Sequence, residues 1–281
     1  MEALVTSARR RESVLVAGLD PHPGRLPPQI LAREAPEHEA VREFCLGTLE
    51  AVEPEVAAVK LQAAFFERLG PEGMAVYAEL VRAAQALDLP VISDVKRGDI
   101  GPVAAAYAEA HLFIYGATCV TVNPYMGADA VRPFLEEARR QGRGGGVFSL
   151  VATSNPSAQE LQGAGEPPLF ELAARLVAEV GETSGDYSDA GAVVGATRPE
   201  VGARVRELLP EALFLVPGFG AQGGSARAVQ SMLDTRNSGV LVNSSRDILY
   251  AYEPAGGDYK TLSRRAAARA RESLRAAGAR P

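Results

Sequence analysis

The clearest chemical signal lies in residues 90–101, PVISDVKRGDIG, where a short apolar run ends in Asp94, Lys96 and Asp99. The chain has only three lysines, and a second one, Lys60, also lies in an apolar, strand-like run. Burying like charges is costly, because two unit charges about 4 Å apart interact by roughly 4 kcal/mol at an effective dielectric near 20. Alternating lysines and aspartates offset that cost, since each charge has an opposite neighbour. Such a cluster suits a site in which a lysine stays protonated as a general acid beside an ionised carboxylate.

Ordinary structural ion pairs are the alternative explanation for any single Asp–Lys pair. Two of the three lysines, however, lie on otherwise apolar segments, where solvation at the surface does not explain them. This placement favours a functional role for the cluster.

The elements that must position these residues are short apolar runs separated by helical patterns. Continuous apolar runs of this length suit parallel strands that are buried on both faces. We predict strands at residues 14–19, 56–62, 90–95, 117–123, 147–152, 192–196, 213–217 and 240–243. Amphipathic stretches at residues 72–88, 167–183 and 259–279 predict helices, and QGRGGG (141–146) predicts a helix stop and turn. Eight strands alternating with helices predict an α/β fold, a single-domain (β/α)8 TIM barrel over residues 1–281; a doubly wound open sheet is the alternative.

In a barrel of this kind, functional groups collect where the strands end, at the C-terminal face. Polar side chains follow nearly every predicted strand, which indicates that they converge on one mouth. In chain order they are Asp20, Lys60, the 94–99 cluster, Asn123, Ser154 with Asn155, Thr197 with Arg198, and the segments PGFGAQGG and NSSRD.

Composition narrows the classes of function. The net charge of −6 argues against a general nucleic-acid or anionic-membrane surface. No apolar run is long enough for a signal peptide or a membrane span, so we expect a soluble, cytoplasmic protein. Two cysteines in apolar segments fit structural thiols, and three scattered histidines lack the spacing of a zinc site. We therefore expect no metal site.

The motif D-x-K-x-x-D-I-G in DVKRGDIG (94–101) resembles the orotidine 5'-phosphate decarboxylase family. Other family motifs follow in the expected order: GLDP, KLQAAFFE, TVNPYMG, ATSNP, VPGFGAQGG and VNSSRDI. The resemblance spans roughly residues 14–250 and is closest to the longer bacterial (type 2) subfamily.

This resemblance implies a cofactor-free decarboxylation of orotidine 5'-monophosphate to uridine 5'-monophosphate. It makes Lys96 the proton donor to C6 of the pyrimidine and places Asp94 against the departing carboxylate. Lys60 would complete the alternating network and touch the ribose. Asp20 would bind ribose hydroxyls, and Ser154 would hydrogen-bond the pyrimidine.

The resemblance also implies a homodimer with shared active sites, in which Asp99 and Ile100 reach into the site of the neighbouring subunit. One departure from the family pattern lies next to them. This chain has Pro102 and Val103 where small hydroxyl residues are expected, and a threonine at position 103 would contact the partner's ribose. One hydrogen bond between subunits is thereby in doubt, although Pro102 is compatible with the first turn of a helix.

The phosphate end is predicted after the seventh and eighth strands. Gly218-x-Gly220-x-x-Gly223 formally matches a dinucleotide fingerprint, but it follows the seventh strand rather than the first. Loops at this position form the usual phosphate site of a barrel. Gln222 and Arg246 would grip the phosphate, assisted by the backbone N–H of Ser245. Alternatively, the glycines serve a tight turn and Arg246 a surface pair.

Three other functions remain open at this point. Lys60 or Lys96 could form a Schiff base in an aldolase or transaldolase, although flanking aspartates oppose the neutral amine that this needs. A related barrel decarboxylase could act on a sugar phosphate through an enediolate with a divalent metal. A non-catalytic protein could bind the nucleotide without turnover.

Overall fold

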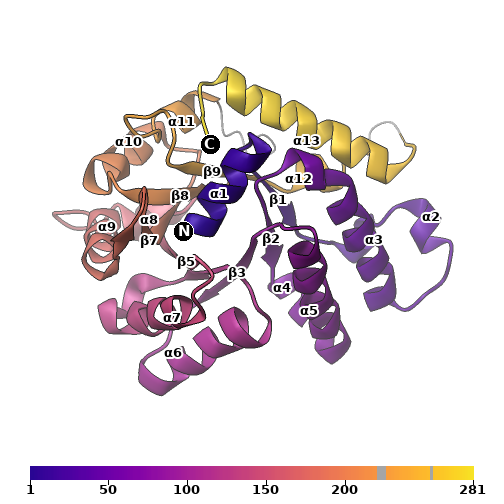
Figure 1. Ribbon diagram of the computed structural model, residues 1–281, viewed down its shortest axis with the longest axis horizontal. Helices are drawn as coiled ribbons and strands as arrows, with labels where there is room; N and C mark the ends of the chain where they lie inside the picture. The colour runs from indigo at the N-terminus through magenta and orange to yellow at the C-terminus, as the bar shows by residue number, and fades with distance from the viewer. Residues whose placement is uncertain (220–225, 254–255) are drawn as a thin grey trace.

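The computed structural model describes residues 1–219, 226–253 and 256–281 of the chain. Eight parallel strands form a closed barrel, because β5 pairs with β7 as well as with β4 (Figure 1). This closure confirms the predicted TIM barrel and excludes the open sheet. The barrel strands are β1 (Leu15–Leu19), β2 (Ala58–Gln62), β3 (Val91–Arg97), β4 (Cys119–Val122), β5 (Gly146–Ala152), β7 (Tyr187–Val194), β8 (Ala212–Val216) and β9 (Val240–Ser244).

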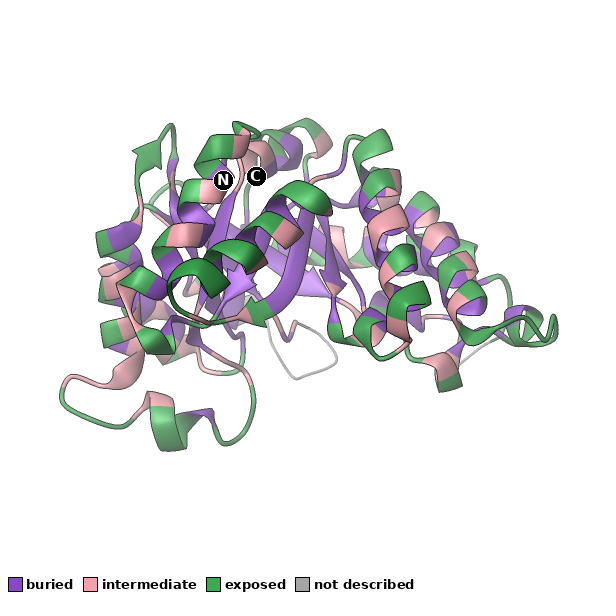
Figure 2. Ribbon diagram, turned by 90° about the horizontal axis from the view of Figure 1, so that it is seen from below, coloured by how far each residue is buried: buried purple, intermediate pink, exposed green. Residues whose placement is uncertain are grey.

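Helices surround the barrel, with their apolar sides on the strands and their polar sides in water (Figure 2). The α-helices are α1 (Glu2–Arg11), α2 (Pro28–Leu31), α3 (Glu37–Val52), α4 (Ala64–Glu67), α5 (Gly70–Ala86), α6 (Gly101–Ala108), α7 (Ala128–Gln141), α8 (Ala158–Gln162), α9 (Leu169–Val180), α10 (Pro199–Leu208), α11 (Ala226–Gln230), α12 (Arg246–Leu249) and α13 (Tyr259–Ala276). Short 3₁₀ segments are η1 (Pro23–Arg25), η2 (Glu53–Glu55) and η4 (Pro124–Met126), and η3 (Glu109–Ile114) is a π-helical extension of α6. In the described residues, no helix is both long and apolar enough to span a membrane.

Most predicted elements are confirmed to within a few residues. The exception is the sixth predicted strand, 192–196, because β7 begins earlier, at Tyr187. Its first residues pair in a small antiparallel hairpin with β6 (Thr183–Ser184), which turns at Gly185 with a φ of 82°. Because this hairpin contains polar residues, the start of the strand cannot be recognised from a run of apolar residues.

The N-terminal end of the barrel is closed by α1, whose label lies over the barrel axis in Figure 1. Leu4 of α1 is fully buried in a cluster with inward-facing strand residues such as Ile92, Cys119 and Phe148. Cys45 and Cys119 are both buried free thiols, as expected from the sequence, and burial raises the pKa of Cys119 to about 11. With one end filled by apolar packing, the C-terminal end is the one that carries polar groups.

Candidate active site

A cavity of about 720 Å³ opens at the C-terminal ends of the barrel strands. It is lined by many of the predicted site residues, namely Asp20, Lys60, Asp94, Lys96, Ser154, Ser245 and Arg246. Apolar side chains from β5, β7 and β8, including Leu150, Val193 and Leu215, line another part of it. The cavity therefore has a charged wall, formed by β1 to β3, and an apolar wall.

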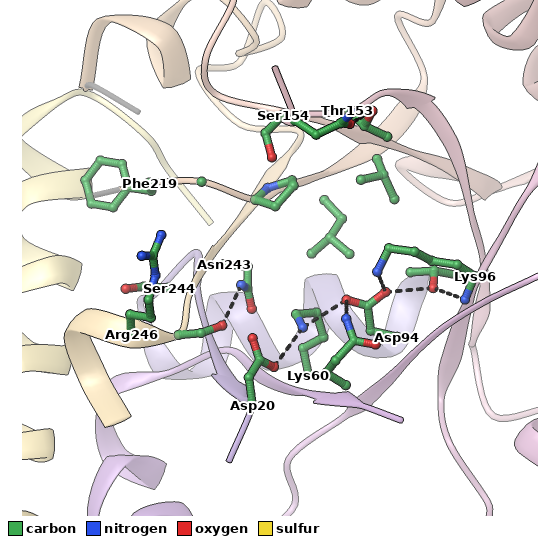
Figure 3. Close-up of a pocket in the computed structure, with 18 of the residues that line it drawn as sticks. Asp20, Lys60, Asp94, Lys96, Thr153, Ser154, Phe219, Asn243, Ser244 and Arg246 are labelled. Atoms are coloured by element: carbon green, nitrogen blue, oxygen red, sulfur yellow. Dashed lines mark hydrogen bonds and ion pairs between the residues drawn. The ribbon is translucent and has the colours of Figure 1, made fainter. Parts of the chain in front are cut away.

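The charged wall is an unbroken alternation of charges (Figure 3). The Nζ atom of Lys60 lies 3.2 Å from Oδ1 of Asp20 and 2.9 Å from Oδ2 of Asp94. The Nζ atom of Lys96 lies 2.5 Å from Oδ1 of Asp94. The side chains of Lys60 and Asp94 are only 5% and 9% exposed, whereas that of Lys96 is 43% exposed. Lys96 is thus the more exposed of the two lysines that line the cavity.

Asp94 is the centre of this arrangement, and each of its carboxylate oxygens has two donors. Oδ1 accepts from Lys96 and from the hydroxyl of Thr121, while Oδ2 accepts from Lys60 and from the amide of Gln62. Burial alone would raise the pKa of Asp94, but the two ammonium groups outweigh it and hold the pKa well below its usual range. The carboxylate is therefore ionised at any physiological pH.

Lys60 is held in its charged form by its two carboxylate neighbours. Burial lowers the pKa of this lysine, but Asp20 and Asp94 more than compensate, so that its pKa is raised above the ordinary value. A lysine in this state does not act as a neutral nucleophile at physiological pH.

The approach of Lys96 to Asp94 depends on an irregularity in β3. Along the pairing with β4, β3 advances from Ser93 to Arg97 while β4 advances only from Val120 to Val122, which is a β-bulge. Lys96 lies in the bulge with a φ of 48°, a left-handed conformation that is uncommon for any residue but glycine. In a regular strand, residues 94 and 96 would lie on the same face but would be separated by the full rise of two extended residues.

Asp20 is anchored through its backbone by a buried tyrosine of the segment after α12. The Tyr250 hydroxyl donates to the carbonyl oxygen of Asp20 over 3.0 Å and accepts from the backbone N–H of His22 over 2.7 Å. Burial is the main cause that raises the pKa of Tyr250 to about 12, so this hydroxyl keeps its proton. The segment that follows β1, with Asp20, is thereby fixed beside Lys60.

Ser154 lies across the cavity from the charged wall (Figure 3). The preceding residue, Thr153, is clamped by Gln162 of α8, which accepts from its backbone N–H over 2.9 Å and donates to its hydroxyl over 2.6 Å. A side chain at Gly195 would meet the backbone of Ser154 at 2.9 Å. The absence of a side chain there allows the β5 loop to pass close to the end of β7.

The predicted phosphate residues lie at the end of β9. Ser245 accepts a hydrogen bond from the amide of Asn243 over 3.1 Å, and the exposed Arg246 begins α12. A Cβ atom at Gly18 would lie 2.0 Å from the Ser245 hydroxyl, so β1 needs a glycine at this position. Gln222 lies outside the described residues.

Asp99 and Ile100 do not line the cavity of their own chain. They follow β3 at the start of α6, where Asp99 Oδ1 accepts from the backbone N–H of Ile100 over 2.9 Å. The Ile100 side chain is among the most exposed large apolar ones of the described residues, at 52%. Pro102 lies in the first turn of α6, as expected.

Three contributors to the site were not singled out from the sequence: Gln62, Thr121 and Tyr250. Gln62 and Thr121 are polar residues at the C-terminal ends of β2 and β4, and that position alone is a usable signal. Tyr250 gave none, because its role depends on a contact with a loop 230 residues away in sequence.

Comparison with known proteins decides the family. Residues 13–256 match the model of the orotidine 5'-phosphate decarboxylase / HUMPS family. The chain belongs to this family. It is 43% identical over 253 residues to an orotidine 5'-phosphate decarboxylase of Deinococcus radiodurans, with 89% of each chain covered. It is 38% identical over 300 residues to one of Caldicellulosiruptor bescii, with 98% of each chain covered.

A solved structure agrees with this assignment. The structure of Leishmania donovani OMP decarboxylase matches with a TM-score of 0.79 and 34% identity, covering 99% of this chain and 97% of that one. The family resemblance drawn from the motifs is thereby confirmed over nearly the whole chain.

Proposed function

We propose that this protein decarboxylates orotidine 5'-monophosphate to uridine 5'-monophosphate, since its relatives are named orotidine 5'-phosphate decarboxylases. The observation that carries the proposal is the contact of Lys96 with Asp94 in an alternating row of charges at the mouth of the barrel. This arrangement supplies both a proton and a fixed negative charge at one point of the cavity.

The reaction requires both a proton donor and a fixed negative charge. The bond between C6 and the carboxylate breaks, carbon dioxide leaves, and the electron pair stays on a ring carbon with no adjacent carbonyl to delocalise it. The Lys96 ammonium stabilises that charge and then gives its proton to C6, forming the new C–H bond. Arginine would serve poorly, because it does not release a proton near neutral pH.

Asp94 would face the departing carboxylate. Because two ammonium groups keep it ionised, it presents a fixed negative charge that favours release of the neutral product. Lys60 and Asp20, which are paired with each other, would bind the ribose hydroxyls. Ser154, on the opposite wall, would hydrogen-bond the pyrimidine and fix the position of C6.

The phosphate would be held at the end of β9 by Arg246 and the backbone N–H of Ser245, with a contribution from Gln222, which follows β8 in the sequence. A charged group remote from the reacting carbon supplies binding energy that can organise the site. The position of Arg246 on the rim of the cavity supports this assignment.

We also propose that a second copy of the chain completes each site through Asp99 and Ile100. Their position outside their own cavity and the exposure of Ile100 support this. Further exposed apolar side chains lie on α6, which begins directly after Ile100, and on η4: Val103, Tyr125 and Met126. Val103 gives the partner an apolar contact in place of a hydroxyl.

The direct test is the ultraviolet absorbance of orotidine 5'-monophosphate with purified protein and excess chelator. We expect conversion to uridine 5'-monophosphate by the wild type and its loss in Lys96→Ala. Absence of turnover by folded wild-type protein would refute the proposal, and the site would then be tested on sugar phosphates with magnesium restored. Borohydride trapping with a carbonyl substrate would reveal a Schiff-base enzyme instead.

Sharing of the site is tested by mixing two inactive variants, Lys96→Ala and Asp99→Ala. In a two-fold dimer with shared sites, random exchange of subunits leaves about a quarter of the sites with both native residues. We expect activity to return to that level on mixing. If each chain supplied its own Asp99, mixing would restore nothing.

A further inference from the structure

The hydroxyl group of Thr121 in β4 makes all its hydrogen bonds to residues of β3. It donates to Oδ1 of Asp94 over 2.9 Å and accepts from the backbone N–H groups of Val95 and Lys96, over 3.0 and 2.9 Å. A hydroxyl has one donor and two acceptor sites, so all three are occupied. The residue is 1% exposed, so no water competes for these bonds.

These three bonds act on the bulge of β3. In a regular parallel ladder, strand N–H groups donate to carbonyl oxygens of the neighbouring strand, but the bulge breaks that pattern between Ser93 and Arg97. The hydroxyl of Thr121 takes the place of the missing acceptors for two consecutive N–H groups. It thereby compensates for the left-handed conformation of Lys96, which otherwise costs free energy.

The same hydroxyl also fixes the partner of Lys96. Oδ1 of Asp94 accepts from both Thr121 and Lys96, so the hydroxyl defines where the ammonium can bind that oxygen. The Thr121 hydroxyl therefore positions Lys96 at both ends. It binds the backbone N–H of Lys96 directly, and it acts on the ammonium group through Asp94.

We propose that Thr121 is a positioning residue of the reaction: its hydroxyl holds the bulge of β3 and thereby aims the Lys96 ammonium at the reacting carbon. This inference rests on the proposed function for its chemistry, but its geometric content concerns Lys96 alone. Thr121 itself need not touch the substrate.

The chain offers a matched control on the same strand pair. Thr118 accepts from the backbone N–H of Val91 over 3.1 Å, at the opposite end of β3 and β4 from the cavity. Thr118, which directly precedes β4, and Thr121 of β4 each accept from a backbone N–H of β3, so Thr118→Val and Thr121→Val both remove such an acceptor. Only the second change touches the bulge.

The kinetic test compares Thr121→Val, Thr121→Ser and Thr118→Val. We expect Thr121→Val to lower kcat by about 100-fold, the loss that a misplacement of about 1 Å can cause, with little change in the affinity for uridine 5'-monophosphate. Thr121→Ser keeps the hydroxyl and should stay within several-fold of the wild type, and Thr118→Val should match the wild type in kcat. An equal loss of kcat in Thr118→Val would assign both residues a merely structural role and overturn the proposal.

A second measurement does not depend on activity. The chain has only three lysines, so trace acetylation with acetic anhydride followed by peptide mapping reports on each one. Lys60 is buried, and Lys260, with a side chain 48% exposed, serves as the internal reference. We expect Thr121→Val to raise acetylation of Lys96 relative to Lys260 several-fold, because the ammonium leaves Asp94, and Thr118→Val to leave the ratio unchanged.

The two measurements separate the possible failures. If the wild type does not decarboxylate, the proposed function fails, and the acetylation ratio still decides whether Thr121 positions Lys96. If Thr121→Val does not fold, Thr121→Ser and Thr121→Ala carry the same comparison, because they differ only in the hydroxyl. An unchanged ratio in the variant without a hydroxyl would overturn the proposal.

Discussion

Replacing Asp94 with asparagine should destabilise the fold, although the two side chains have nearly the same shape. Asparagine has one acceptor oxygen and one NH₂ donor group, whereas every neighbour of Asp94 is a donor. If the asparagine oxygen faces Lys96 and Thr121, its NH₂ group faces Lys60 and Gln62; the reverse orientation only exchanges the conflict. Either way, a donor is pressed against an ammonium group.

The size of the effect follows from the burial of the partners. Removing one member of a buried ion pair costs about 3–5 kcal/mol, because the other charge is left uncompensated. Here Lys60 keeps Asp20 as a partner, and Lys96 is exposed enough for water to solvate it. We therefore expect the low end of this range, a loss of about 3 kcal/mol in the free energy of unfolding at pH 7.

Equilibrium unfolding in urea, at one fixed protein concentration, measures this loss. The control is Asp88→Asn, because Asp88 also forms an ion pair, with Arg10, but its side chain is 81% exposed. We expect that variant to lie within about 0.5 kcal/mol of the wild type. An Asp94→Asn variant as stable as Asp88→Asn would refute the view that this charge row is held together by burial and pairing.

The pH dependence of stability supplies a second check. The pKa of Asp94 is lowered on folding, so its contribution is complete above the ordinary aspartate pKa, about 4, and is lost as the pH falls through the folded value. The pKa of Lys60 is raised, so its contribution is complete below the ordinary lysine pKa, about 10.4, and is lost as the pH rises through the folded value. Asp94→Asn should therefore flatten the decline of stability on the acid side. An acid limb as steep as that of the wild type would contradict this assignment.

Three further substitutions test other parts of the site and scaffold. Gly18→Ala would push its methyl group against the Ser245 hydroxyl, so we expect about tenfold weaker binding of uridine 5'-monophosphate by calorimetry; an unchanged Kd would be contrary evidence. Tyr250→Phe removes the hydrogen bond to the carbonyl oxygen of Asp20 and should lower kcat/KM. Because the pKa of Tyr250 is about 12, the ratio of the variant's kcat/KM to that of the wild type should not vary between about pH 6 and pH 10. A ratio that varies with pH would contradict this. Arg206→Met leaves four buried carbonyl oxygens without their guanidinium donor and should cost about 3 kcal/mol in urea unfolding without lowering kcat; a stable variant would show that these carbonyls find other donors.

The fold and the main charges of the site could be predicted from sequence for one geometric reason. Parallel strands of a barrel all end at the same rim, so residues that follow different strands meet even when far apart in the chain. The pattern placed Asp20, Asp94 and Lys96 at strand ends and Lys60 on the second strand, and the structure brings them into one row. Once the barrel topology is known, residues at different strand ends can be expected to be neighbours in space.

The conformation of Lys96 could not be predicted in the same way. Its left-handed backbone depends on hydrogen bonds to Thr121, which lies 25 residues further along the chain on another strand. No local propensity indicates such a state for a lysine, since only glycine adopts it readily. The start of β7 was missed for a related reason, because its first residues include the polar Ser188 and Asp189 and pair with β6 in a hairpin, so they do not form an apolar run.

The two lysines of the row are chemically distinct because Asp94 divides its oxygens between them. Oδ2 binds Lys60, which is buried and held by a second carboxylate, Asp20, and these two carboxylates raise its pKa above the ordinary lysine value. Oδ1 binds Lys96, which has no second carboxylate within ion-pair distance among the described residues and faces the cavity. A proton donor must reach the substrate and must release its proton when charge develops there. Burial and pairing therefore support the proposal that Lys96 transfers the proton while Lys60 holds Asp94 in place.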